Sequence, residues 1–200
     1  RRIAQAHAIV DILADDLLLV RTAADIERAH REGKHGIVID FQDTLAFSDD
    51  LDRIDLFHNL GLRMVQLTYI LQNLVGDGCT ERYQGGLTTF GIEVIRRLNE
   101  LRILVDISHC SEQVSWDALA VSTQPVVVSH SAAKALSGHP RAKSDELARA
   151  VAERGGYFGV VVVPGFISSQ PHAMLDDFVR HVEHLVDICG IDHVGIGTDK

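Results

Sequence analysis

Two neighbouring segments of the sequence end a run of aliphatic residues in Ser-His. The first reads Leu-Val-Asp-Ile-Ser-His and ends at His109, and the second reads Val-Val-Val-Ser-His and ends at His130. A third aliphatic run, near the end of the chain, is followed by Asp199. One histidine after a strand is more often a loop or capping residue, but the repetition favours a site. Imidazole nitrogens and a carboxylate oxygen suit zinc or a similar divalent ion.

The elements that position these residues follow a regular alternation. Seven short β-branched runs alternate with longer segments whose apolar residues recur at i, i+3 and i+4, as expected for βα units around a parallel sheet. The clearest helical segments are 89–101 and 175–189, with one more expected over 1–14. The seven expected strands are 17–20, 37–41, 63–67, 103–107, 125–128, 157–163 and 193–196.

This alternation suits an α/β fold, either a doubly wound sheet or a (β/α)8 TIM barrel. No GxGxxG or GxxxxGK[ST] motif follows any of the runs, so the barrel is preferred. In such a barrel, catalytic groups stand at the carboxyl ends of the strands. His109, His130 and Asp199 are then expected at one mouth.

The length of the chain bears on how much of a barrel it holds. A whole barrel takes about 250 residues, and the 200 residues here begin with a helical pattern and stop at a strand end. We expect residues 1–200 to form a single, partial TIM-barrel domain that lacks strand one and the closing helix. We also expect that its open strand edges would make it fold poorly alone.

The composition narrows the classes of partner. There are 19 Lys and Arg residues against 28 Asp and Glu residues. This excess of negative charge argues against nucleic acid as a binding partner. Three widely spaced cysteines indicate a reduced chain. No apolar stretch is long enough to span a membrane and no secretory signal is evident, so a cytoplasmic location is expected. Eleven histidines are about twice an ordinary share.

Several motifs carry a resemblance to a known family. The segments LVDISHCS, SHSAAKALSGHPRAKSDELARAVAERGG and HVEHLVDICGIDHVGIGTD, with LGLRMVQLTY and GLTTFGIEVIRRLNEL, resemble the renal (membrane) dipeptidase family of zinc metallopeptidases, in the amidohydrolase superfamily. The resemblance implies that His109 and His130 bind one of two zinc ions. It implies that Asp199 handles the proton beside the other ion, and that Arg141 holds the terminal carboxylate of the substrate.

The sequence also departs from the family pattern. Gln42 stands where the family has a Glu that bridges both metals, and a neutral amide replaces that carboxylate poorly. Asp43 follows it but should point to the opposite face. Tyr69, in Leu-Thr-Tyr, replaces a histidine that polarises the scissile carbonyl, although a phenol can still donate one hydrogen bond to an oxyanion. The family's strand-one His-x-Asp pair has no counterpart in these residues. We expect a divergent member with one or two divalent ions.

Three functional hypotheses follow. The first is a metal-dependent hydrolase that cleaves a dipeptide or similar small amide by metal-activated water, with Arg141, Tyr69 and Asp199 around the substrate. The second is a barrel with an altered metal centre that performs non-peptidase chemistry on a small carboxylate. The third is a degenerate barrel that only binds a ligand or a partner, without catalysis. The partner expected for the first two is a small-molecule substrate, and a homodimer stays open. Of the other histidines, only His139 is expected near Arg141.

Overall fold

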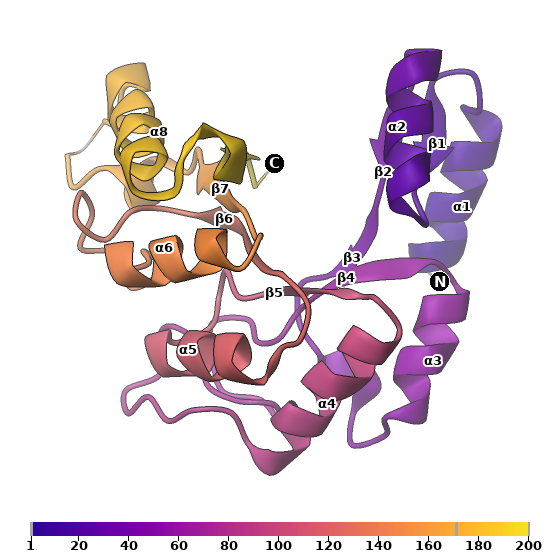
Figure 1. Ribbon diagram of the computed structural model, residues 1–200, viewed down its shortest axis with the longest axis horizontal. Helices are drawn as coiled ribbons and strands as arrows, with labels where there is room; N and C mark the ends of the chain where they lie inside the picture. The colour runs from indigo at the N-terminus through magenta and orange to yellow at the C-terminus, as the bar shows by residue number, and fades with distance from the viewer. Residues whose placement is uncertain (1, 171, 200) are drawn as a thin grey trace.

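The computed structural model describes residues 2–170 and 172–199, in which short parallel strands alternate with helices (Figure 1). The strands are β1 (Leu17–Leu19), β2 (His35–Ile37), β3 (Ile39–Phe41), β4 (Leu62–Gln66), β5 (Leu104–Asp106), β6 (Val126–Ser131), β7 (Phe158–Val161) and β8 (Val194–Gly197). The helices are α1 (Arg2–Ile12), α2 (Ala23–Glu32), α3 (Asp52–Asn59), α4 (Thr89–Glu100), α5 (Glu112–Val121), α6 (Asp145–Glu153), α7 (Pro164–Ile167) and α8 (Leu175–Cys189).

The strand order identifies the fold class. Strands β3 to β8 form one parallel sheet in which each strand pairs with the next in chain order, and β1 pairs with β2 in a separate parallel pair. A doubly wound sheet would reverse its order at a switch point. The unreversed order is that of a TIM-barrel wall, which confirms the expected fold. Within the described ranges, β8 has no pairing to β1 or β3, and the wall is open between them (Figure 1).

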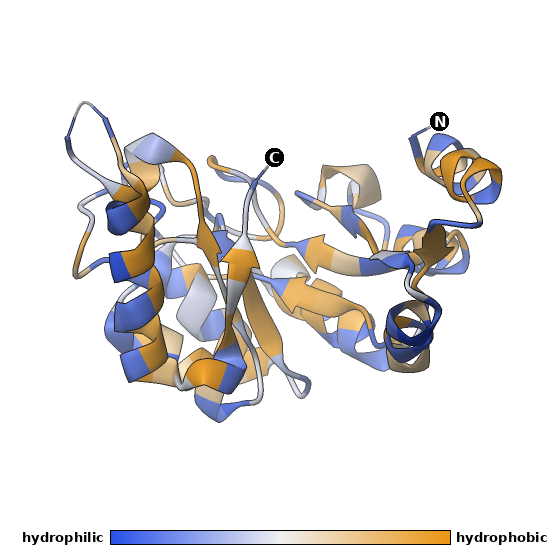
Figure 2. Cartoon of the chain, turned by 90° about the horizontal axis from the view of Figure 1, so that it is seen from above, coloured by the Kyte–Doolittle hydropathy of each residue, from blue (hydrophilic) through white to orange (hydrophobic). Residues whose placement is uncertain are grey.

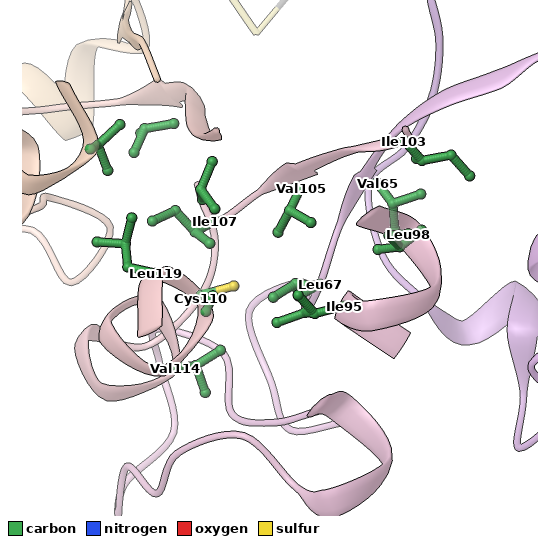
Figure 3. Close-up of a cluster of buried hydrophobic side chains, with 14 of the residues drawn as sticks. Val65, Leu67, Ile95, Leu98, Ile103, Val105, Ile107, Cys110, Val114 and Leu119 are labelled. Atoms are coloured by element: carbon green, nitrogen blue, oxygen red, sulfur yellow. The ribbon is translucent and has the colours of Figure 1, made fainter. Parts of the chain in front are cut away.

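The hydrophobic core lies between the outer face of the sheet and the helices. Figure 3 shows side chains of β4 and β5, such as Val65 and Val105, packed with those of α4 and α5. Seen from above, the strands are mostly hydrophobic and the outer helix faces are mostly hydrophilic (Figure 2). Since side chains alternate along a strand, Gln66 and Asp106 point to the barrel interior.

The run 37–41, expected as one strand, is two. Ile37 ends β2, which pairs with β1, while Ile39 begins β3, which pairs with β4. Val38 between them is 42% exposed. The chain changes pairing partner there, and an apolar side chain in the middle of the run gives no sign of that change.

Several helices begin or end at residues that commonly cap helices. Gly33 ends α2 in the left-handed conformation, with φ at 67°. The side chains of Ser111 and Ser144 accept hydrogen bonds from the backbone at the starts of α5 and α6. At α3 the N-cap position is occupied by Leu51, whose side chain makes no capping hydrogen bond. No described helix has the length and apolarity needed to cross a membrane.

Candidate active site

The two Ser-His motifs meet at the mouth of the barrel wall. His109 follows the end of β5, His130 lies within β6, and both side chains are buried. Their Nε2 atoms are 3.0 Å apart. Two nitrogens on one tetrahedral zinc ion, each about 2.0–2.1 Å from it, would be about 3.3 Å apart. The pair is therefore spaced as two ligands of one ion.

The surroundings keep both imidazoles neutral. Burial, followed by the positive charge of Arg141, lowers the pKa of His109 to about 2. Burial and Arg141 also lower the pKa of His130, although the carboxylates of Asp106 and Asp199 act in the opposite direction. The neutral imidazole is the form that binds metals. Both residues are thus held in the protonation state that a metal ligand requires.

A single carboxylate, which was not among the site residues predicted from the sequence, supports both motifs. Asp106, the last residue of β5, is 2% exposed. Its Oδ1 accepts hydrogen bonds from the backbone N and the Oγ of Ser108, at 2.9 and 2.6 Å, and from the backbone N of Ser129 at 3.1 Å. Its Oδ2 accepts from Ser129 Oγ at 2.5 Å. The available signal was an acidic residue inside an apolar run, three positions before the first histidine.

The backbone around His130 is irregular. The register between β6 and β7 shifts between Val128 and Ser131, so Ser129 and His130 lie in an interruption of the ladder. Such irregularities re-aim side chains next to active sites. Here the interruption lets the side chains of consecutive residues contact one another, since Ser129 Oγ lies 2.7 Å from His130 Nδ1.

Arg141 lies against the histidine pair. Its side chain is 3% exposed. Its Nη1 is 2.5 Å from Nε2 and 3.1 Å from Nδ1 of His109, and its Nη2 donates to the carbonyl oxygen of His130 at 2.7 Å. Its buried Nε has no hydrogen-bond partner among the described residues. The guanidinium lies over Phe166, and His139 accepts from the Arg141 backbone N, which makes His139 the expected neighbour.

Tyr69 connects the histidine pair to a cavity. Its ring stacks on His109 with the ring centres 4.4 Å apart, and its side chain is 44% exposed. It also lines a cavity of about 660 Å³ together with Gln42, Asp40 and Asp43. Gln42 therefore faces the same space as Tyr69. The Asp43 carboxylate accepts from the backbone N of Leu45, so it is turned into the following 3-10 helix.

Asp199 reaches the site from β8. Its Oδ1 is 3.9 Å from Nε2 of His130, and its side chain is 31% exposed. The structure thus brings together His109, His130, Arg141, Asp199 and Tyr69, while Gln42 lies across the shared cavity.

The donor set fits a divalent ion with open coordination positions. Two neutral imidazoles face one point, and a carboxylate lies close to one of them. In residues 2–170 and 172–199 no group of three or more His, Cys, Asp or Glu side chains is arranged as a complete metal site. Catalytic zinc sites keep a position open for water or substrate. The chain therefore supplies a partial ligand set.

Known proteins resemble this chain in sequence and in fold. The family model described as membrane dipeptidase (peptidase family M19) matches residues 1–200. The dipeptidase tcpJ of Claviceps purpurea is 31% identical over 194 residues, which cover 96% of this chain and 46% of that protein.

Two solved structures have the same fold. An amidohydrolase from Pseudomonas aeruginosa is 37% identical with a TM-score of 0.92, over 98% of this chain and 60% of that one. A metallopeptidase from Rhodobacter sphaeroides, solved with a phosphinate mimic of the dipeptide L-Ala-D-Ala, is 29% identical with a TM-score of 0.86, over 91% of this chain and 55% of that one. The chain spans about half to three fifths of the length of these relatives. With the family model matched from the first residue to the last, the chain belongs to the membrane dipeptidase family.

Proposed function

We propose that the protein is a metal-dependent hydrolase that cleaves a dipeptide or a similar small amide, with zinc as its ion. The observation that carries the proposal is the buried pair of Nε2 atoms of His109 and His130, 3.0 Å apart at the ends of barrel strands. The dipeptide mimic held by the Rhodobacter relative supports the substrate class.

Each residue around the pair has a chemical role in this proposal. His109 and His130 hold the ion, which when bound supplies an activated water and polarises the scissile carbonyl. Asp199, whose carboxylate is 3.9 Å from His130 Nε2, would hold a proton at its Oδ1 and deliver it to the leaving amine. Arg141 binds the terminal carboxylate of the substrate, since a guanidinium meets a carboxylate with parallel hydrogen bonds. Tyr69 donates a hydrogen bond to the oxygen on which charge develops.

The test is hydrolysis of a dipeptide panel by the full-length protein. We expect release of free amino acids that stops when the ion is removed with a chelator and returns with added zinc. The variant His109→Ala should lose both zinc binding and turnover, whereas His35→Ala, which removes an exposed histidine, should keep both. Absence of turnover from a protein that holds stoichiometric zinc would reject the peptidase assignment.

Gln42 favours a second candidate, a family member with an altered metal centre that acts on a small carboxylate by another reaction. An amide brings no charge to a bridging position between two dications. The variant Gln42→Glu separates the candidates, with Gln124→Glu, which adds a carboxylate at the exposed loop before β6, as its control. A second bound metal without change in the native reaction supports this candidate, and a gain in dipeptide hydrolysis supports the first.

A further inference from the structure

One buried carboxylate joins the two histidine motifs. Asp106 accepts four hydrogen bonds, two from Ser108 and two from Ser129, the residues that precede His109 and His130. The second motif is further tied to the first, because the backbone N of His130 donates to Ser108 Oγ at 3.1 Å. Asp106 therefore sets the relative position of two strand ends that are neighbours in the sheet.

The hydrogen atoms of this network can be assigned by counting. A carboxylate accepts hydrogen bonds but does not donate them, and a serine hydroxyl has one hydrogen to give. The hydroxyl of Ser129 lies 2.5 Å from Asp106 Oδ2, so its hydrogen points to the carboxylate. Its oxygen can then only accept from His130 Nδ1, 2.7 Å away. The Nδ1 atom of His130 must carry the proton.

This assignment fixes the other nitrogen of the ring. A neutral imidazole with a hydrogen on Nδ1 has a lone pair on Nε2. In His130 that lone pair faces Nε2 of His109. Hydrogen bonds behind a metal ligand determine its tautomer and ring orientation, and their loss commonly costs 10- to 100-fold in metal affinity.

We propose that Asp106 is a positioning residue of the metal site, which holds His130 through Ser129 in the Nδ1–H tautomer so that Nε2 is available to the ion. The inference rests on the proposed function for the identity of the ion. It concerns the tautomer of His130 in the protein without metal, which can be measured independently of hydrolysis.

The first measurement is the tautomer itself. Long-range proton–nitrogen NMR spectra of the metal-free, full-length protein distinguish a protonated Nδ1 from a protonated Nε2, and the signals of His130 are assigned by their loss in His130→Gln. We expect the Nδ1–H form in the wild type. We expect a mixture, or the Nε2–H form, in Asp106→Asn and in Ser129→Ala, because each variant removes one link of the chain of hydrogen bonds.

The second measurement is zinc affinity, obtained by competition with a chromophoric chelator. Asp106→Asn and Ser129→Ala should each raise the zinc Kd by about 10- to 100-fold. The control is Asp177→Asn, which removes another buried carboxylate whose hydrogen bonds are to Met174 and Arg180 at the start of α8. This control should leave both the tautomer and the Kd unchanged, even where its melting temperature falls.

The outcomes separate the two proposals. An Nε2–H tautomer in the wild type, or an unchanged tautomer in both variants, would overturn the role of Asp106. A changed tautomer with unchanged zinc affinity would overturn its role in metal binding. If Asp106→Asn fails to fold, Ser129→Ala decides the question. A wild type that binds no zinc would overturn the proposed function, while the tautomer in the two variants would still decide what Asp106 does to His130.

Discussion

Gly197 of β8 passes so close to Ser129 of β6 that a Cβ at Gly197 would lie 2.1 Å from the Ser129 carbonyl oxygen and 2.9 Å from Cα of His130. Gly159 of β7 approaches the same carbonyl oxygen, at 2.0 Å from an added Cβ. Three strands therefore converge on the backbone that carries His130. This convergence lets Asp199, two residues after Gly197, reach the histidine pair.

Gly197→Ala should damage both stability and site geometry. The new methyl group meets backbone atoms that cannot rotate away, and overpacking of this kind costs about 1–3 kcal/mol of unfolding free energy. Denaturant unfolding and zinc affinity measure the two effects. Gly138→Ala is the control, because a Cβ there meets nothing within 4 Å. Equal unfolding free energies for the two variants would contradict the steric account.

Arg141→Lys should weaken substrate binding more than turnover. Lysine keeps the charge but loses the two-pronged donor geometry, and one lost charged hydrogen bond is worth about 1.5–3 kcal/mol. We expect KM for dipeptides to rise by about tenfold or more, and a substrate with an amidated C-terminus to show no such change. An equal loss for both substrates would exclude carboxylate recognition by Arg141.

Tyr69→Phe should lower kcat while zinc affinity and KM stay close to wild type. The phenylalanine ring preserves the stacking on His109, and only the hydroxyl is lost. Removal of one oxyanion donor typically costs about 10²–10³ in kcat. Tyr83→Phe, at a tyrosine that is 80% exposed, should have no effect. A wild-type kcat in Tyr69→Phe would show that the Tyr69 hydroxyl takes no part in the reaction.

His181 should make the fold acid-sensitive. It is 1% exposed; its Nδ1 accepts from the backbone N of Ala133, and its Nε2 contacts the carbonyl oxygen of Ile167. Burial lowers the pKa of His181 from 6.5. Between that value and the lower folded-state pKa, the unfolded chain binds a proton at this residue and the folded chain does not. The stabilisation is present above pH 6.5 and is lost as the pH falls toward the folded-state pKa.

The measurement for His181 is the free energy of unfolding in denaturant between pH 7.5 and 5. The advantage of the wild type over His181→Gln should shrink with falling pH, by at most about 1.4 kcal/mol per pH unit. His35→Gln, at an exposed histidine, is the comparison. Curves for wild type and His181→Gln that run parallel would show that His181 does not titrate as inferred.

Lys143 should produce the same trend at high pH, with stability again rising as the pH rises. Its side chain is fully enclosed and donates to the carbonyl oxygen of Cys110 and to Ser115 Oγ. Burial lowers the pKa of Lys143 from 10.5, so the folded protein gives up this proton before the unfolded chain does. Stability therefore rises with pH from the folded-state pKa up to 10.5.

The test compares unfolding free energies of wild type and Lys143→Met from pH 7 toward pH 10. The difference in favour of the wild type should grow with pH, whereas Lys134→Met, at an exposed lysine, should show a constant difference. A constant difference for Lys143→Met as well would mean that the buried amine keeps the same pKa in both states.

Much of the fold could be predicted because its determinants are local. Parallel strands covered on one side by helices appear as β-branched runs, and the apolar period of α8 gave its limits, Leu175–Cys189, from the sequence alone. The break at Val38 could not be predicted, because an exposed valine between two strands has the same local pattern as a valine inside one.

Part of the candidate site could likewise be predicted from local sequence, and part of it could not. The identical endings at His109 and His130 indicated a pair, and the structure shows that their Nε2 atoms meet. The contact of Arg141 with His109 joins residues 32 positions apart, and the bond from Ser129 to Asp106 joins residues 23 apart. Such contacts depend on which strands become neighbours, so the acidic residue inside the apolar run marked Asp106 as unusual but did not indicate its partners.

The unreversed strand order also sets how many strand pairings each part of the site depends on. His109 and His130 stand on consecutive βα units, so they meet once β5 and β6 have paired. Asp199 reaches them through two further pairings, of β7 with β6 and of β8 with β7. Contacts between consecutive units form with less loss of chain entropy than contacts across the whole barrel. The contact between the two histidines therefore needs one strand pairing, whereas the approach of Asp199 needs two more.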